Sequence, residues 1–413
     1  MSSTAVLGCI WGDEAKAKIV DVLAKDADYV IRFQGGNNAG HTIKLNDEKY
    51  VFHLVPAGIL YPGKKCILGS GVVIDLFALI DEIEDLKNKG IVFENRFFID
   101  ARAHIVLPHH KEFDDNSEAD DNQTKIGTTK RGIGPCYADS FARVGIRFGD
   151  LFEEDFLIER LKNNYFYHNY TQDNIVAVAE KLMEAGKILQ AYLKQVPYLL
   201  KDAKDENLLF EGAQGSLLDV NFGTYPFVTS SHTISGGIAV GSGFPGKIDK
   251  VLGVYKSYFT RVGEGPFPTE LMDETGEQIR IQGNEFGSTT GRPRRCGWFD
   301  AVAAKYTAML NGVDEIALTL LDVLTGFETL SICIGYRHNN QKLDEFPYSS
   351  KILTEVIPEY VQLPGWKEDI TDITDFSQLP ENAKNYVFTI EELLGLKVMI
   401  VSVGPERNQT IFR

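Results

Sequence analysis

The chain has 413 residues, of which 44% are hydrophobic and 24% charged, a composition typical of a globular protein with one large core or two ordinary ones. Its formal net charge of −16 argues against a nucleic-acid-binding function, because so acidic a surface repels phosphate backbones. The five scattered cysteines lack a Cys-x-x-Cys spacing, the first residues are not expected to be a secretory signal, and no stretch of 18 uncharged apolar residues occurs. We therefore expect a cytoplasmic protein without a membrane span.

The predicted elements alternate between strands and helices. Apolar runs predict strands at 4–11, 29–33, 42–45, 50–54, 208–210, 250–255, 316–321, 330–334 and 397–403. Helical spacing of apolar residues predicts helices near 19–23, over 76–89 and over 174–198, and the acidic stretch 114–123 is expected to be an exposed loop. The strands at 42–45 and 50–54 are expected to form a hairpin, and the later strands to complete a central sheet. The pattern favours one composite α/β domain over 1–413, with a large, mostly parallel sheet flanked by helices.

The segment Gly12-Asp-Glu-Ala-Lys-Ala-Lys18 lies where the first strand passes into the first helix. Lysines and backbone N–H groups at a helix N-terminus bind anions, and the acidic pair could hold Mg²⁺ or accept a proton. The alternative is an ordinary helix start with solvated charges. The segment lacks the Gly-Lys-Ser/Thr ending of a Walker A loop. The better formal match at 58–64 is followed by Lys65 instead of Ser or Thr and is interpreted as a turn.

Four other loops carry groups suited to ligand binding. The glycine-rich loop 32–41 ends in His41, and 127–135 combines paired threonines with a basic pair that suits a phosphate or simply a surface loop. Three arginines within 292–295 predict an anion site, because guanidinium groups bind carboxylates and phosphates in bidentate fashion. Asp322 ends an apolar strand and could pair with the N1–H and 2-amino group of guanine. The histidines at 104, 109 and 110 are expected to be structural.

Taken in order, these stretches resemble the adenylosuccinate synthetase family from end to end. The matching segments are Trp11–Glu14, Gln34–Thr42, Gly127–Pro135, Phe210–Gly215, Tyr225–Ser231, Arg261–Glu270, Thr289–Trp298 and Leu321–Leu324. The resemblance implies a P-loop-NTPase-like nucleotide site without a Walker A motif. It also implies GTP-dependent ligation of L-aspartate to inosine monophosphate (IMP) through 6-phosphoryl-IMP, with one Mg²⁺ per subunit.

The resemblance also implies roles for particular residues. Asp13 would take the N1 proton of IMP, His41 would be the second catalytic group, and Asp13 with the Gly40 carbonyl would ligate Mg²⁺. The residues implied for GTP are Gly12, Glu14, Lys16, Lys18, Gly40, Thr42, Arg294, Asp322, Ser402, Gly404 and Pro405. Those implied for IMP are Asn38, Thr129, Arg143, Gln214, Thr229 and Arg292. Those implied for aspartate are Ser288, Thr289, Thr290, Arg292 and Arg294. Arg143 would come from the partner subunit, so a homodimer is implied.

Four positions depart from the family's usual residues. Ala15, Ala17 and Lys130 replace glycines, and Leu320 replaces a lysine near the guanine. A methyl group costs about 1–2 kcal/mol if Ala15 or Ala17 needs a positive φ. These departures leave two alternatives: a related ligase that aminates another purine nucleotide, such as a guanylate, or a non-catalytic nucleotide-binding paralogue.

Overall fold

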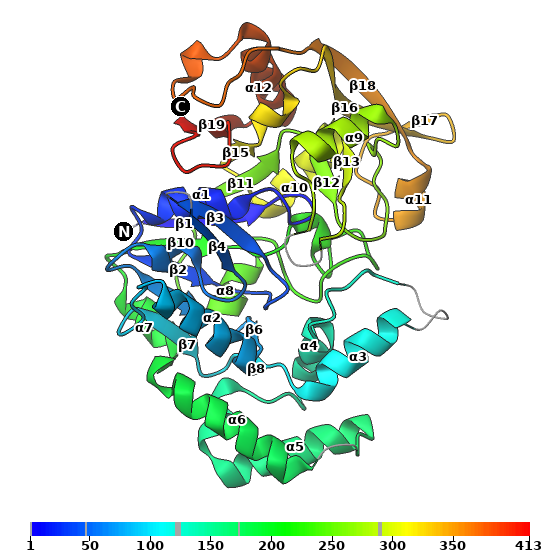
Figure 1. Cartoon of the computed structure of the whole chain (residues 1–413). Helices are drawn as coiled ribbons and strands as arrows, with labels where there is room; N and C mark the ends of the chain where they lie inside the picture. Colours follow the sequence, from blue (N-terminus) through cyan, green and yellow to red (C-terminus); the bar gives the residue numbers. More distant parts are fainter. Residues whose placement is uncertain (1, 46–47, 120–124, 172–173, 288–290) are drawn as a thin grey trace.

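A ten-stranded sheet runs through the computed structural model, which describes residues 2–45, 48–119, 125–171, 174–287 and 291–413 (Figure 1). In spatial order its strands are β20 (Thr410–Phe412), β19 (Lys397–Ser402), β15 (Glu315–Thr319), β11 (Lys250–Lys256), β1 (Ser2–Gly8), β10 (Asn207–Glu211), β2 (Tyr29–Arg32), β5 (Lys65–Leu68), β7 (Phe97–Asp100) and β9 (Leu193–Lys194). Neighbouring strands are parallel except β19 and β20, which are antiparallel. The predicted mostly parallel sheet is confirmed.

Helices cover both faces of this sheet. The helices of the described residues, some of which pack on the smaller sheets instead, are α1 (Lys16–Ala24), α2 (Leu76–Asn88), α3 (Pro108–Ala119), α4 (Ile133–Ala142), α5 (Glu154–His168), α6 (Ile175–Leu189), α7 (Val196–Asp202), α8 (Gly237–Ser242), α9 (Glu274–Gln282), α10 (Ala301–Asn311), α11 (Ser350–Glu355) and α12 (Glu381–Leu394). Successive residues of β1 point to opposite faces, so Ala5 and Leu7 pack with α7, α8, α10 and α12. Val6 packs in a second core with α1, α2, α5 and α6. Burial on both faces explains why β1 is an almost uninterrupted apolar run.

Smaller sheets surround the main one. They comprise β3 (His41–Leu45) with β4 (Glu48–Phe52), β6 (Val73–Ile74) with β8 (His104–Ile105), β12 (Phe259–Arg261) with β13 (Arg295–Gly297), and β14 (Phe299–Asp300), β17 (Gln341–Leu343) and β18 (Ile357–Pro364) around β16 (Thr329–His338). The hairpin predicted at 42–54 is confirmed by β3 and β4. Figure 1 shows β16 and β18 at the end of the molecule opposite α5 and α6.

Three local predictions are wrong. The run 330–334 belongs to β16 in the separate sheet, because an apolar strand does not specify its partner. Residues 114–119 are the end of α3 and not a loop, since Asp114 is buried and accepts a hydrogen bond from the Gly132 N–H at 2.9 Å. The helix predicted over 174–198 ends at Leu189, and β9 and α7 follow it. Residues 120–124 lie outside the described part.

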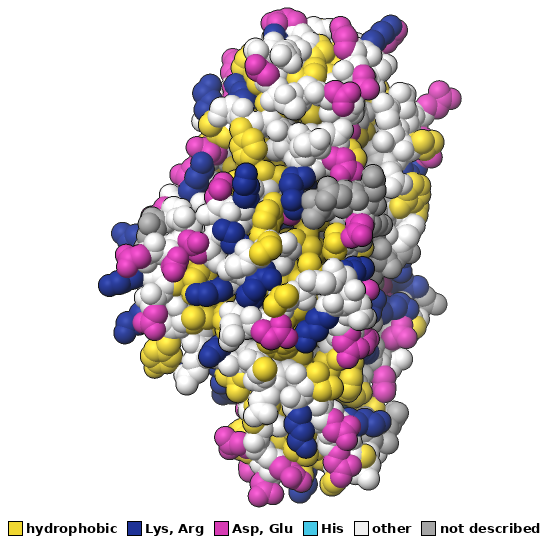
Figure 2. Space-filling view, turned by 60° about the vertical axis from the view of Figure 1, so that its left-hand side comes forward, with side chains coloured by type: hydrophobic (Ala, Val, Ile, Leu, Met, Phe, Trp, Pro, Cys, Tyr) yellow, Lys and Arg dark blue, Asp and Glu magenta, His cyan; other side chains and the backbone are white. Residues whose placement is uncertain are grey.

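Charged side chains of both signs are interspersed over the face shown in Figure 2, with hydrophobic side chains along its middle. No helix among the described residues combines the length and apolar character needed to cross a bilayer.

Candidate active site

A cleft of about 570 Å³ opens at the carboxyl ends of the central parallel strands. The loops that follow β1, β2 and β10 contribute Asp13, Asn38 and Gln214 to its lining. Lys256 is the last residue of β11, and Leu320 follows β15 directly. Ligands of parallel α/β sheets bind at this edge, because the loops after neighbouring strands converge there.

The loop after β1 is held together by Glu14. One oxygen of the buried Glu14 carboxylate accepts hydrogen bonds from the N–H groups of Ile10 at 2.9 Å and Gly12 at 2.8 Å. The other oxygen forms an ion pair of 2.9 Å with the Lys16 ammonium, which is itself buried but lines the cleft. Glu14 therefore fixes the loop and the position of Lys16, and does not itself line the cleft.

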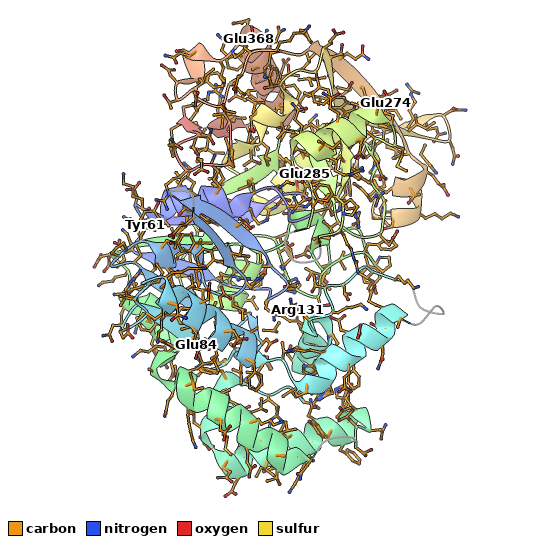
Figure 3. The ribbon with its side chains drawn as sticks, in the orientation of Figure 1. Tyr61, Glu84, Arg131, Glu274, Glu285 and Glu368 are labelled. Carbon is orange, nitrogen blue, oxygen red and sulfur yellow. The ribbon has the colours of Figure 1, made fainter. Side chains whose placement is uncertain are left out.

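Asp13 lies in a network of buried polar groups at the cleft wall. Its Oδ2 accepts a hydrogen bond from the Thr260 hydroxyl and lies 3.7 Å from Nε of Arg294. The Lys256 ammonium donates to Thr260 Oγ1 at 2.7 Å and to Glu285 at 2.9 Å. Glu285 also accepts from Arg294 Nη1 at 2.7 Å. Figure 3 labels Glu285, whose carboxylate is shared by Lys256 and Arg294.

The charges of this network oppose one another. Burial raises the pKa of the Asp13 carboxyl, and the cations Lys256 and Arg294 counteract this effect. Burial acts on Glu285 in the same direction, but Lys256 and Arg294 outweigh it and hold the pKa of that carboxyl below its usual value. Asp13 is thus more basic than an ordinary carboxylate, as a group that removes a weakly acidic proton requires.

Most of the predicted site residues that the structure describes line the cleft together. They are Gly12, Asp13, Lys16, Asn38, Gly40, Thr42, Thr129, Gln214, Thr229, Arg292 and Arg294. His41 begins β3, but its side chain lies outside the described part of the structure. Ser288, Thr289 and Thr290 lie outside the described residues. Outside the cleft lining are Glu14, Lys18, Arg143, Asp322, Ser402, Gly404 and Pro405.

Several of these outer residues form a group of their own beside α1. The buried Lys18 ammonium donates to Ser402 Oγ at 2.8 Å and to the carbonyls of Gly404 at 2.6 Å and Gln409 at 2.8 Å. Burial lowers the pKa of Lys18 to about 8, and the charge of Asp322 partly opposes this. Burial also raises the pKa of Asp322 to about 6, and its Oδ1 is buried without a hydrogen-bond partner among the described residues. An unpaired buried acceptor of this kind can receive a donor from a ligand.

Three of the four departures from the usual family residues lie at left-handed backbone positions. Ala15, Lys130 and Leu320 have φ values of 58°, 56° and 56°, whereas Ala17 lies inside helix α1. Left-handed φ is costly for residues with a Cβ, so the methyl of Ala15 costs about 1 kcal/mol and that of Ala17 does not. The expectation of strain thus applies to Ala15 alone of the two alanines.

The sequence interpretation did not identify Lys256, Thr260 and Glu285. Each is far along the chain from Asp13, and their contacts arise only when β11, β12 and the loop after α9 come together. The one local signal was Lys256, which ends the apolar strand β11. An ammonium at the end of a buried strand needs a partner, because an unpaired charge would be costly there.

The profile of the adenylosuccinate synthetase family matches residues 5–411. The chain belongs to the adenylosuccinate synthetase family. It is 49% identical to the adenylosuccinate synthetase of Carboxydothermus hydrogenoformans and 48% identical to that of Geobacillus kaustophilus, with at least 98% of each chain covered. The solved structure of the fully ligated adenylosuccinate synthetase of Plasmodium falciparum superposes with a TM-score of 0.95 and 39% identity over both complete chains.

A more distant structure shares the fold. The succinoaminodeoxyadenylate synthetase of cyanophage S-2L, bound to dGMP and to dATP as energy donor, has a TM-score of 0.65 at 19% identity, over 100% of this chain and 95% of its own. Membership of the adenylosuccinate synthetase family confirms the predicted resemblance and a ligase activity.

Proposed function

We propose that the protein joins L-aspartate to IMP with GTP as phosphoryl donor, giving adenylosuccinate, GDP and phosphate, that it does so in the cytoplasm, and that residues 1–413 form one composite domain. The observation that carries this proposal is the cleft in which a basic carboxylate, a buried lysine and two arginines meet: Asp13, Lys16, Arg292 and Arg294. A non-catalytic paralogue has no need of the buried charges of Lys16, Lys256 and Glu285 beside Asp13 and Arg294, because each buried charge is costly to desolvate.

Asp13 would remove the N1 proton of IMP, so that the 6-oxygen attacks the γ-phosphorus of GTP and GDP leaves. The amine of aspartate would then attack C6 of the 6-phosphoryl intermediate, lose a proton, and displace phosphate. Lys16 and Arg294, which line the cleft, would neutralise phosphate charge. Asn38, Thr129, Gln214 and Thr229 would orient IMP, and Arg292, with Arg294, would hold the carboxylates of aspartate. His41 would stabilise the charge that develops during the transfers.

The residues at the cleft fit a magnesium ion. Mg²⁺ takes oxygen ligands, and the cleft lining offers the Asp13 carboxylate and the Gly40 backbone carbonyl. The ion would supply neutralisation of the triphosphate charge.

The guanine base would bind at the group beside α1. Asp322 supplies a buried carboxylate oxygen that matches the N1–H and 2-amino group of guanine, and adenine would leave it facing a lone pair. Lys18 holds the segment with Ser402 and Gly404 against α1, next to Pro405. Thr42, Gly12 and Lys16 would then contact the phosphates.

Arg143 would serve the partner subunit of a homodimer. It caps α4 with a φ of 67°, its side chain is exposed, and it makes no ion pair within the described chain. Two exposed aromatic side chains belong to the helices that meet at this turn: Phe141 on α4, two residues before Arg143, is 76% exposed, and Phe166 on α5 is 85% exposed. Large exposed apolar side chains around a basic residue are typical of an interface that binds an anion across it.

The direct test is an assay of the purified protein with IMP, aspartate, Mg²⁺ and GTP, following purine absorbance and phosphate release. Product formation with IMP and GTP is expected, and Asp13→Asn should lower kcat by at least about 10²-fold without loss of folding. A parallel assay with dGMP and ATP tests the related ligase. Turnover there and none with IMP would overturn the proposal.

A further inference from the structure

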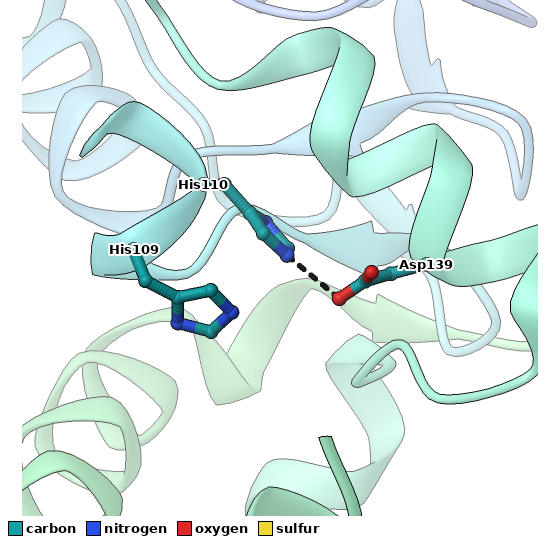
Figure 4. Close-up of side chains that lie close together, drawn as sticks. All are labelled: His109, His110 and Asp139. Atoms are coloured by element: carbon teal, nitrogen blue, oxygen red, sulfur yellow. Dashed lines mark hydrogen bonds and ion pairs between the residues drawn. The ribbon is translucent and has the colours of Figure 1, made fainter. Parts of the chain in front are cut away.

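Asp139, on α4, is the centre of a buried cluster of histidines away from the cleft. Its Oδ2 accepts hydrogen bonds from His110 Nε2 of α3 at 2.8 Å and from Asn164 Nδ2 of α5 at 2.5 Å. Its Oδ1 accepts one from His168 Nε2 at 2.7 Å. Figure 4 shows the bond from His110, with the ring of His109 beside it. One carboxylate therefore joins three helices.

The directions of the hydrogen bonds argue against a metal site here, although His109, His110 and Asp139 could bring ligand atoms within 4.8 Å of one another. The Leu107 N–H donates to Nδ1 of His110 at 3.0 Å, so that nitrogen is an acceptor and the proton of the neutral ring is on Nε2. That proton is donated to Asp139, and a metal would have to displace it. Burial raises the pKa of Asp139, but the donors outweigh it and leave the carboxyl ionised.

The same residues hold the turn that carries Arg143. The backbone carbonyl of Asp139 accepts the N–H groups of Val144 at 3.0 Å and Gly145 at 3.1 Å. Asn164 Nδ2 also donates to the Val144 carbonyl at 3.2 Å. Arg160 Nη2, one turn earlier on α5, donates to the carbonyls of Arg143 at 3.3 Å and Gly145 at 2.6 Å.

We propose that Asp139, with Arg160, is a positioning residue that fixes the left-handed Arg143 turn so that its guanidinium meets the nucleotide phosphate in the partner subunit's cleft. This inference rests on the proposed action of Arg143 across a homodimer. An exposed arginine has many rotamers, and a fixed backbone removes part of the conformational entropy lost on binding. Asp139 thus affects the neighbouring active site and not its own.

The alternative is an effect within the same subunit. The first turn of α4 lines the cleft of its own chain through Ile133, Gly134 and Pro135. A change at Asp139 could disturb that wall directly. Subunit mixing separates the two, because a defect in trans is repaired by a partner whose turn is intact.

The experiment measures the KM for IMP of Asp139→Asn and of Arg160→Met, with Lys162→Met as a control for loss of one positive charge on the same helix. Arg160 is half-buried, so its variant tests the proposal even if Asp139→Asn fails to fold. Both variants are expected to raise the KM for IMP about tenfold with kcat within about twofold, and the control to leave both unchanged.

Each variant is then mixed with Asp13→Asn, whose chain is inactive but carries an intact Arg143 turn, and subunit exchange is verified. At IMP concentrations well below the raised KM, adding the inactive chain should increase the rate, since the mixed dimer contains one complete site. Arg143→Leu mixed with Asp13→Asn is the reference. If the reference recovers activity and the Asp139 and Arg160 mixtures do not, the inference is wrong and the dimer proposal stands. If the reference fails as well, both are wrong.

Discussion

Replacing Asp322 with asparagine should stabilise the unliganded protein and weaken its binding of GTP. Burial raises the pKa of this carboxyl from 3.8 to about 6, so the folded state resists its ionisation. A difference of about 2 pKa units corresponds to about 3 kcal/mol of destabilisation when the group is charged. Asparagine has nearly the same shape and no charge, which removes this penalty.

The pH dependence follows from the sign of the shift. Because the pKa of Asp322 is higher in the folded than in the unfolded state, its stabilising contribution is fully present below about pH 4 and is lost as the pH rises to about 6. Asp322→Asn should therefore match the wild type near pH 4 and exceed it by about 2–3 kcal/mol at pH 7. In a chain of 413 residues this is a rise in Tm of about 3 °C.

The assay is thermal unfolding at both pH values, with and without GDP, together with the KM for GTP. GDP should stabilise the wild type much more than the variant, because the amide can no longer accept from both guanine donors, and the KM should rise about ten- to a hundredfold. A variant that is less stable at pH 7 would refute the argument from the buried charge. A variant that is more stable but binds GTP normally would remove Asp322 from the guanine site.

Three further predictions concern single positions. Thr260→Val should lower kcat about tenfold with little change in KM, because the Thr260 hydroxyl orients Asp13, and Thr260→Ser should keep kcat near that of the wild type. Steady-state kinetics test this, and an unchanged kcat in Thr260→Val would refute it. Ala15→Gly should raise the free energy of unfolding by about 0.5–1 kcal/mol, because Ala15 has a left-handed φ, and Ala17→Gly should lower it by a similar amount, because Ala17 is helical. Urea titrations that give the same sign for both variants would contradict this explanation. Leu320→Lys should lower the KM for GTP with kcat nearly unchanged, and a higher KM would show that an added ammonium is unfavourable there.

Local sequence patterns predicted the first part of the sheet and most loops of the cleft. The run before Gly12 is apolar throughout because β1 is buried on both faces, and the loops after β1, β2 and β10 carry the polar groups. The partner of β16 and the helix that includes Asp114 could not be predicted. Both depend on contacts distant in sequence, β16 with β18 and Asp114 with Gly132. The family resemblance supplied residue roles that composition and spacing could not.

The sequence shows where the arginines lie but not which of them are already paired with carboxylates in the fold, as the loop at 292–295 and Arg143 illustrate. The loop at 292–295 stood out as a cluster of positive charge in an acidic chain, yet Arg294 is bound to Glu285 and lies beside Asp13. Its guanidinium is therefore held in place before any substrate arrives, and the net charge at that wall is small. As a site residue, Arg143 was named only through the family resemblance. Its backbone N–H and carbonyl are hydrogen-bonded to Ser140 and Arg160, and its side chain makes no ion pair within the described chain. A phosphate that binds Arg143 would pair with a guanidinium that has no other ionic partner in the described chain. A phosphate that binds Arg294 would compete for the guanidinium with the carboxylates of Asp13 and Glu285, so its net attraction is weaker.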